Sequence, residues 1–179
     1  MKGGTGKSTL ALCIASIIGE DKCDIVSLDP QDTLGKASTL TGLFKPVEAR
    51  ATSKPFVIWD TPPYLTKDIE HVYKNASIII VPCKIGYPDL LAVKSTYAQL
   101  EKVGVISKTV LVFNESRLPV KKNDREVISI FSQNYPDLKI AKQIIALRND
   151  FKNVFLRPIE GKALEEIKNL MKEVCIIPS

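Results

Sequence analysis

The stretch that most constrains this chain is its opening, MKGGTGKSTL, where closely spaced glycines and a Gly-Lys-Ser step precede an apolar run. A loop that wraps a phosphate needs inward-facing backbone N–H groups, and therefore residues without side chains that can adopt positive φ. Residues 8–18 predict a helix whose N-terminus would face the anion. The spacing favours a nucleotide-binding loop over an ordinary glycine-rich turn, with Lys7 on the β- and γ-phosphates and the Ser8 hydroxyl on Mg²⁺.

Strand-like and helix-like runs alternate along the rest of the chain. Continuous apolar runs predict strands buried on both faces of a parallel sheet, at residues 23–29, 55–60, 76–83, 108–114 and 138–146. The runs between and after them predict helices at residues 64–75, 89–103, from Asn123 onward, 148–156 and 161–175. Asn123 and Glu126 form a capping-box pattern. We therefore expect one α/β domain over residues 1–179, with a mostly parallel twisted sheet and helices on both faces.

Polar residues follow three of the expected strands. Asp29, Asp60 and Asn114 each come at the end of an apolar run. Each residue alone could cap a turn. Because ligands of open α/β sheets bind at the carboxyl ends of the strands, we expect the three to lie at the same rim as the phosphate loop.

The opening motif is specific enough to indicate a family. KGGTGKST resembles the deviant Walker A motif, KGGxGK[ST]T, of the ParA/MinD group of ATPases. In that group the early lysine, here Lys2, reaches across an ATP-sandwich dimer to the partner's nucleotide. The resemblance thus implies a phosphate-loop fold of the deviant Walker type, with ATP and Mg²⁺ as its ligands.

Later segments match the same group in order. SLDPQ resembles the A′ motif, usually DxDPQ, and FVIWDTPP resembles the Walker B motif. The resemblance implies that Asp29 acts at the attacking water, that Asp60 holds the Mg²⁺ water shell, together with Ser8, and that Asn114 meets the adenine. It assigns ATP binding to the loop residues Gly3, Gly4, Thr5, Gly6, Lys7, Ser8 and Thr9, and catalysis to Lys2, Lys7 and Asp29.

The resemblance extends over nearly the whole chain. Within the group, the chain most resembles the small, ParF-like plasmid-partition proteins. It implies a slow, partner-stimulated ATPase that converts ATP and water to ADP and phosphate. Such a protein dimerises with ATP, binds DNA without sequence preference and drives plasmid or chromosome segregation. Its partners would be a second copy, DNA and a centromere-binding, ParB-like protein, in the cytoplasm and on the nucleoid when ATP is bound.

The charge of the chain is concentrated in one segment. Residues 117–157 hold nine basic and four acidic residues, which equals the net charge of +5 of the whole chain. Such a segment fits a surface for a polyanion about as well as an ordinary solvated surface. Within it, QIIALRNDFKNVF resembles the region where ParA proteins carry a DNA-contacting arginine. The expected DNA contacts are Arg148, Lys152, Lys121 and Lys122.

Three features depart from the family pattern. Ser27 stands where the A′ motif usually has its first aspartate, and only thirty residues separate Asp29 from Asp60. No strand precedes the phosphate loop, so the first strand of the sheet is expected to be missing and Met1 to be an internal methionine. Cys13, Cys23, Cys83 and Cys175 form no CxxC pair, which argues against a metal site or a disulfide.

Two alternatives stay open at this level. A MinD-like ATPase that cycles on membranes would use a C-terminal amphipathic helix, but ALEEIKNLMKEVCIIPS carries several acids and fits packing better than insertion. No membrane partner is therefore expected. The other alternative is a truncated, inactive remnant, given the missing strand and the short middle segment.

Overall fold

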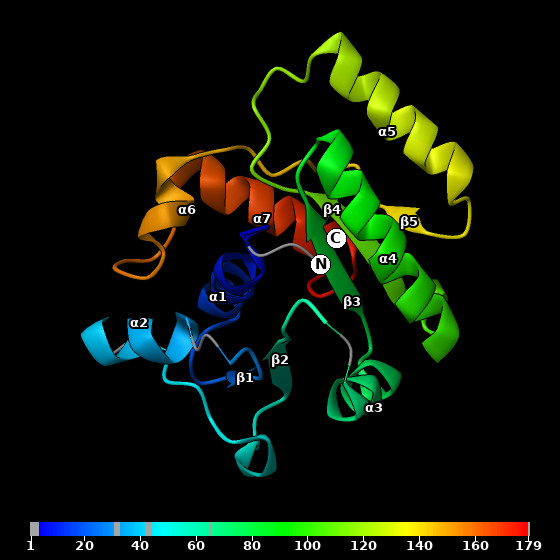
Figure 1. The fold of residues 1–179 in the computed structure, drawn as a ribbon. Coiled ribbons are helices and arrows are strands. Elements are labelled where there is room, and N and C mark those ends of the chain that lie inside the picture. Colours follow the sequence, from blue (N-terminus) through cyan, green and yellow to red (C-terminus); the bar gives the residue numbers. More distant parts are fainter. Residues whose placement is uncertain (1–3, 31–32, 42–43, 65, 179) are drawn as a thin grey trace. The chain divides into compact units, whose positions relative to one another are not determined.

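The structure is a computed structural model that describes residues 4–30, 33–41, 44–64 and 66–178 (Figure 1). The chain divides into two compact units. Unit 1 contains Met1–Thr5, Pro63–Leu147 and Asn169–Ser179, and unit 2 contains Gly6–Pro62 and Arg148–Lys168. The division falls between Thr5 and Gly6, in the glycine-rich opening of the chain, and between Lys168 and Asn169 in the last helix.

Unit 2 is built on two parallel strands, β1 (Cys23–Ser27) and β2 (Phe56–Asp60). Their register pairs Cys23 with Phe56 and Ser27 with Asp60. Helix α1 (Lys7–Ile18) packs on this pair and buries the stretch from Leu10 to Ala15. The unit also holds α2 (Thr33–Thr41), a 3₁₀ turn at Ala49–Ala51, α6 (Asn149–Asn153) and the first part of α7 (Gly161–Glu173).

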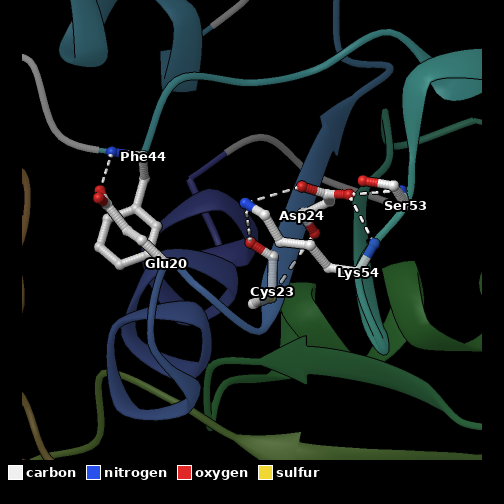
Figure 2. Close-up of polar contacts among 6 residues, drawn as sticks. All are labelled: Glu20, Cys23, Asp24, Phe44, Ser53 and Lys54. Carbon is white, nitrogen blue, oxygen red and sulfur yellow. Dashed lines mark hydrogen bonds and ion pairs between the residues drawn. The ribbon is translucent and has the colours of Figure 1, made fainter.

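A buried carboxylate fastens the start of β1 to the segment that leads into β2. Asp24 is 4% exposed and accepts the backbone N–H groups of Ser53 and Lys54 at 2.8 and 3.2 Å (Figure 2). The ammonium group of Lys54 lies 2.9 Å from the other carboxylate oxygen and also donates to the Cys23 carbonyl. The Ser53 N–H and the Lys54 ammonium lower the pKa of Asp24 below its ordinary value.

Unit 1 has a three-stranded parallel sheet in the order β3-β4-β5, formed by Ile79–Cys83, Thr109–Phe113 and Lys139–Ile140. The central strand β4 is buried along its whole length. Its helices are α3 (Lys67–Asn75), α4 (Tyr87–Val103) and α5 (Lys122–Asn134), with a 3₁₀ turn at Ile106–Lys108. Val93 and Leu100 of α4 and Phe131 of α5 share a core with Leu111 and Phe113 of β4.

The expected alternation of parallel strands and helices is confirmed. Two helices end at glycines. Gly19 is the C-cap of α1, and Gly104, in the left-handed region at φ 77°, is the C-cap of α4. The described strands form two hydrogen-bonded sheets, and among the described residues none before Lys7 lies in a strand. That the chain is a single domain stays a prediction.

Three element predictions are wrong in detail. Helix α5 begins at Lys122 with Lys121 as N-cap, so Asn123 does not cap it. The strand expected at 138–146 is regular only over Lys139–Ile140, because the carboxylate of Glu173 takes the N–H groups of Lys142 and Gln143 at 2.8 and 3.0 Å. Helix α6 is shorter than the expected 148–156, and α2 was not expected.

The C-terminal helix has a buried apolar side. Ala163, Ile167, Leu170 and Met171 of α7 are fully buried. Within the described part of the chain, no helix combines the length and apolar character needed to cross a bilayer. All four cysteines are free thiols, and burial raises the pKa of Cys13 and Cys83 to about 12.

Candidate nucleotide-binding site

The N-terminus of α1 has the backbone geometry that an anion site requires. Gly4 and Gly6 have φ of 77° and 84°, a backbone conformation that residues with a side chain rarely adopt. Gly6 is the N-cap, no side chain caps the helix, and the first turn contains no acidic residue. Within the described part of the chain, no capping side chain takes the N–H groups at the start of this helix, so they can serve an external acceptor, and Lys7 adds a positive charge beside them.

One hydrogen bond joins this helix to the end of β2. The Ser8 hydroxyl donates to Asp60 Oδ2 at 2.6 Å. Asp60 is only 1% exposed, and its second oxygen, Oδ1, has no hydrogen-bond partner among the described residues. A buried carboxylate oxygen without a donor is costly, so this position is suited to a ligand that brings positive charge.

The electrostatics of Asp60 fit the same conclusion. Burial raises the pKa of Asp60, the Ser8 hydroxyl and the Lys7 charge lower it, and the charge of Asp29 raises it further. A hard divalent cation prefers carboxylate and hydroxyl oxygens, which are the groups present at Ser8 and Asp60. The residues present therefore fit Mg²⁺.

A second buried hydrogen bond lies within unit 1. Asn114, the residue after β4, donates its side-chain Nδ2 to the Thr5 carbonyl at 2.9 Å. Both residues are buried, with exposed fractions of 6% and 4%. The strand pattern predicted Asn114 at the rim of the loop, and the family resemblance implied a contact with adenine; a hydrogen bond to the Thr5 carbonyl was not predicted.

The structure places the remaining expected site residues as follows. Lys2 and Gly3 lie outside the described residues. Gly4 and Thr5 belong to unit 1, together with Asn114, whereas Gly6, Lys7, Ser8 and Thr9 belong to unit 2, together with Asp29 and Asp60. Asp29 follows β1 and is half-buried.

The four expected DNA contacts have different surroundings. Arg148 is the N-cap of α6, and its Nε and Nη2 atoms lie 3.0 and 2.5 Å from Glu166 Oε1. The hydrogen bond to Glu166 raises the pKa of Arg148 above its ordinary value. Lys152 is exposed in the same unit, and Lys121 and Lys122 are exposed at the start of α5 in unit 1.

Sequence reasoning missed Glu166, although a signal was available. Glu166 is three residues after Ala163 and four before Leu170, so it falls on the buried stripe of α7. A carboxylate on an apolar stripe requires a cationic partner. That partner is Arg148.

Three solved structures have a fold similar to that of this chain. A plasmid partition protein of Borrelia burgdorferi B31, solved with AMPPNP, matches with a TM-score of 0.76 and 11% identity over 98% of this chain and 95% of that one. McdA of Cyanothece matches without nucleotide, with a TM-score of 0.74 and 14% identity over 97% and 96% of the two chains. Its aspartate-to-alanine variant in complex with ATP gives a TM-score of 0.74 and 16% identity over 99% and 94%.

The chain has the fold of the ParA/MinD-type ATPases. The resemblance drawn from the motifs is thus confirmed at the level of the fold. No family model matches the sequence, and no curated protein matches it.

Proposed function

We propose that the chain is a Mg²⁺-ATP-dependent ATPase of ParA type that segregates plasmid or chromosomal DNA. The observation that carries the proposal is the Ser8–Asp60 hydrogen bond, which joins the N-terminus of α1 to a buried carboxylate whose other oxygen has no partner among the described residues. The solved neighbours support it, since one is a plasmid partition protein bound to AMPPNP and another is an ATP complex.

The binding roles follow from where each group lies. The backbone from Gly4 to Thr9 and the N-terminus of α1 would surround the phosphates, with the Lys7 ammonium on the β- and γ-phosphates. Ser8 and Asp60 would hold Mg²⁺. When bound, the cation neutralises charge on the phosphate oxygens.

We assign hydrolysis to Asp29 and Lys2. Asp29 would act at the attacking water. Its charge already affects the pKa of Asp60, so the two carboxylates share one electrostatic environment. Lys2 would complete the partner subunit's site in an ATP-sandwich dimer. We propose slow turnover that a centromere-binding, ParB-like protein accelerates.

DNA binding is assigned to the basic segment. Lys121, Lys122 and Lys152 are exposed and can contact phosphates without losing a partner that the structure describes. Arg148 would have to leave or share Glu166 to do so. Because phosphate contacts carry no base information, such binding would be indifferent to sequence, and the ATP-bound protein would collect on the nucleoid.

The deciding experiment is titration calorimetry of the chain with Mg²⁺-ATP. Lys7→Ala should abolish detectable binding, because it removes the cation beside the phosphates. Lys22→Ala is the matched control, since Lys22 is an exposed lysine of the same unit outside the loop, and it should bind like the parent. Equal ATP affinity in the Lys7→Ala and parent proteins would refute the site.

A further inference from the structure

The contact between Asn114 and Thr5 joins two segments that are 109 residues apart. The acceptor is a backbone carbonyl, which can only accept, so the side-chain amide must present its nitrogen to it. Both residues are buried, and a buried carbonyl that lost this donor would pay the cost of an unmade hydrogen bond. The contact is therefore built into the interior and is not a chance surface approach.

Asn114 is mounted on a rigid support. Its backbone N–H donates to the Cys83 carbonyl at 2.7 Å, which extends the pairing of β3 and β4 by one residue. The chain is fixed again immediately afterwards. Glu115 has a φ of 53° and pairs with Lys84 at 2.6 Å, and Ser116 N–H donates to the Ile145 carbonyl at 3.1 Å. The amide of Asn114 thus projects from a position that the sheet determines.

The hydrogen bond from Asn114 to the Thr5 carbonyl also determines the direction of the Gly6 N–H. The Thr5–Gly6 peptide is trans, and in a planar trans peptide the C=O and N–H bonds point in opposite directions. Fixing the Thr5 oxygen on Asn114 therefore turns the Gly6 N–H away from Asn114. Gly4 and Gly6, with their positive φ, allow the chain to take this turn on both sides of Thr5.

We propose that Asn114 is a positioning residue that holds the Thr5–Gly6 peptide so that the Gly6 N–H faces a bound phosphate. The inference deepens the proposed function and rests on it, because it assumes that the loop binds the phosphates of ATP. It gives Asn114 a role in phosphate binding, in place of the adenine contact that the family resemblance implies. The two roles make different demands on the ligand, since only one of them needs a base.

The test compares Mg²⁺-ATP with Mg²⁺-tripolyphosphate, which carries the phosphates without a nucleoside. In Asn114→Ala both affinities should fall by the same factor, about tenfold for one lost buried hydrogen bond. Asn114→Asp should lose more, because a carboxylate would face the Thr5 carbonyl with no donor. The control is Asn134→Ala, since Asn134 also donates to a backbone carbonyl but is exposed at the end of α5.

A measurement on the parent protein keeps the inference testable if the variants do not fold. With ¹⁵N-glycine labelling, the Gly6 amide resonance should shift on addition of Mg²⁺-tripolyphosphate. An unchanged Gly6 amide chemical shift on addition of Mg²⁺-tripolyphosphate would overturn the positioning role. So would an Asn114→Ala protein that loses affinity for ATP but not for tripolyphosphate, and that result would support the adenine contact. If the parent binds neither ligand, the proposed function itself fails.

Discussion

At the scale of single residues, Asp60 is kept in a state that is unfavourable without a ligand. One of its oxygens accepts from Ser8, the other has no partner among the described residues, and burial raises its pKa. A carboxyl whose pKa is raised in the folded state destabilises the fold as it ionises. The free energy of unfolding should therefore fall as pH rises from the ordinary aspartate pKa through the raised one.

This predicts opposite effects of Asp60→Asn on stability and on binding. At neutral pH the ligand-free variant should be more stable than the parent by about 1 kcal/mol, or roughly 2–4 °C in Tm, because no buried charge is left unpaired. Its Mg²⁺-dependent ATP affinity should be lost. Thermal unfolding across a pH series and calorimetry measure the two effects, and a variant less stable than the parent at neutral pH would contradict the argument.

Asp29 should separate binding from turnover. Asp29→Ala removes a carboxylate, shortly after β1, whose charge raises the pKa of Asp60 and which the proposed function assigns to the attacking water and not to the phosphates. ATP affinity and ATP-dependent dimerisation should stay at the parent level while hydrolysis stops. Calorimetry, light scattering and phosphate release measure the three properties, and hydrolysis at the parent rate would reduce Asp29 to a turn residue.

Residue types and spacing were enough to predict that Asp60 lies at the same rim as the loop that carries Ser8, because both residues belong to motifs on rigid elements; their direct hydrogen bond was not predicted. The contacts Asn114–Thr5 and Arg148–Glu166 were beyond the sequence. Each joins segments that only the fold brings together, and each engages a side chain that the motif had assigned to a ligand. The periodicity of α7 places Glu166 on a buried stripe, but it does not say which cation pairs with it, and no local pattern indicates the contact of Asn114 with Thr5.

At the scale of elements, signals carried by the local backbone were reliable. Gly19 and Gly104 end their helices as expected, because a residue with positive φ stops a helix wherever it falls. The predicted length of the fifth strand, residues 138–146, was wrong because of a contact with a distant segment. Glu173 of α7 takes the N–H groups of two residues that periodicity had placed in the strand, and only β5 remains regular.

Glu173 should therefore stabilise unit 1 in a way that an ordinary surface glutamate does not. Glu173→Ala leaves the Lys142 and Gln143 N–H groups without their acceptor and should cost about 1–3 kcal/mol in the free energy of unfolding. Glu173→Gln, which keeps one acceptor oxygen, should lose less. Denaturant unfolding measures this, with Glu165→Ala of the exposed side of α7 as control; equal stability of the Glu173→Ala and Glu165→Ala proteins would contradict the prediction.

At the scale of the whole molecule, the excess positive charge lies on exposed side chains of both units. Of the nine basic residues in 117–157, all but Arg148 are exposed. Arg117, Lys121, Lys122, Arg125, Lys139 and Lys142 belong to unit 1, and Arg148, Lys152 and Arg157 belong to unit 2. If these side chains bind DNA phosphates, each of them should add its own contribution to the salt dependence of the DNA affinity.

We expect the ATP-bound protein to bind two unrelated duplexes with equal affinity, and the affinity to fall steeply with salt. Each neutralised phosphate contributes about −0.9 to the slope of log affinity against log salt concentration. Lys121→Ala with Lys122→Ala should flatten that slope by roughly two, and Lys152→Ala by roughly one. Binding with ADP should be much weaker, since a dimer doubles the number of contacts. Fluorescence anisotropy over a salt series measures all three.

Arg148 needs its own control, because Arg148→Ala also leaves Glu166 buried without its cation and should destabilise the protein. Combining Arg148→Ala with Glu166→Gln removes both charges, so a loss of DNA affinity in this double variant reports on Arg148 itself. Lys67→Ala, at the exposed start of α3 and outside the basic segment, should leave the slope unchanged. Salt-independent affinity, or a parent protein that sediments with liposomes and ignores DNA, would favour the membrane-cycling alternative.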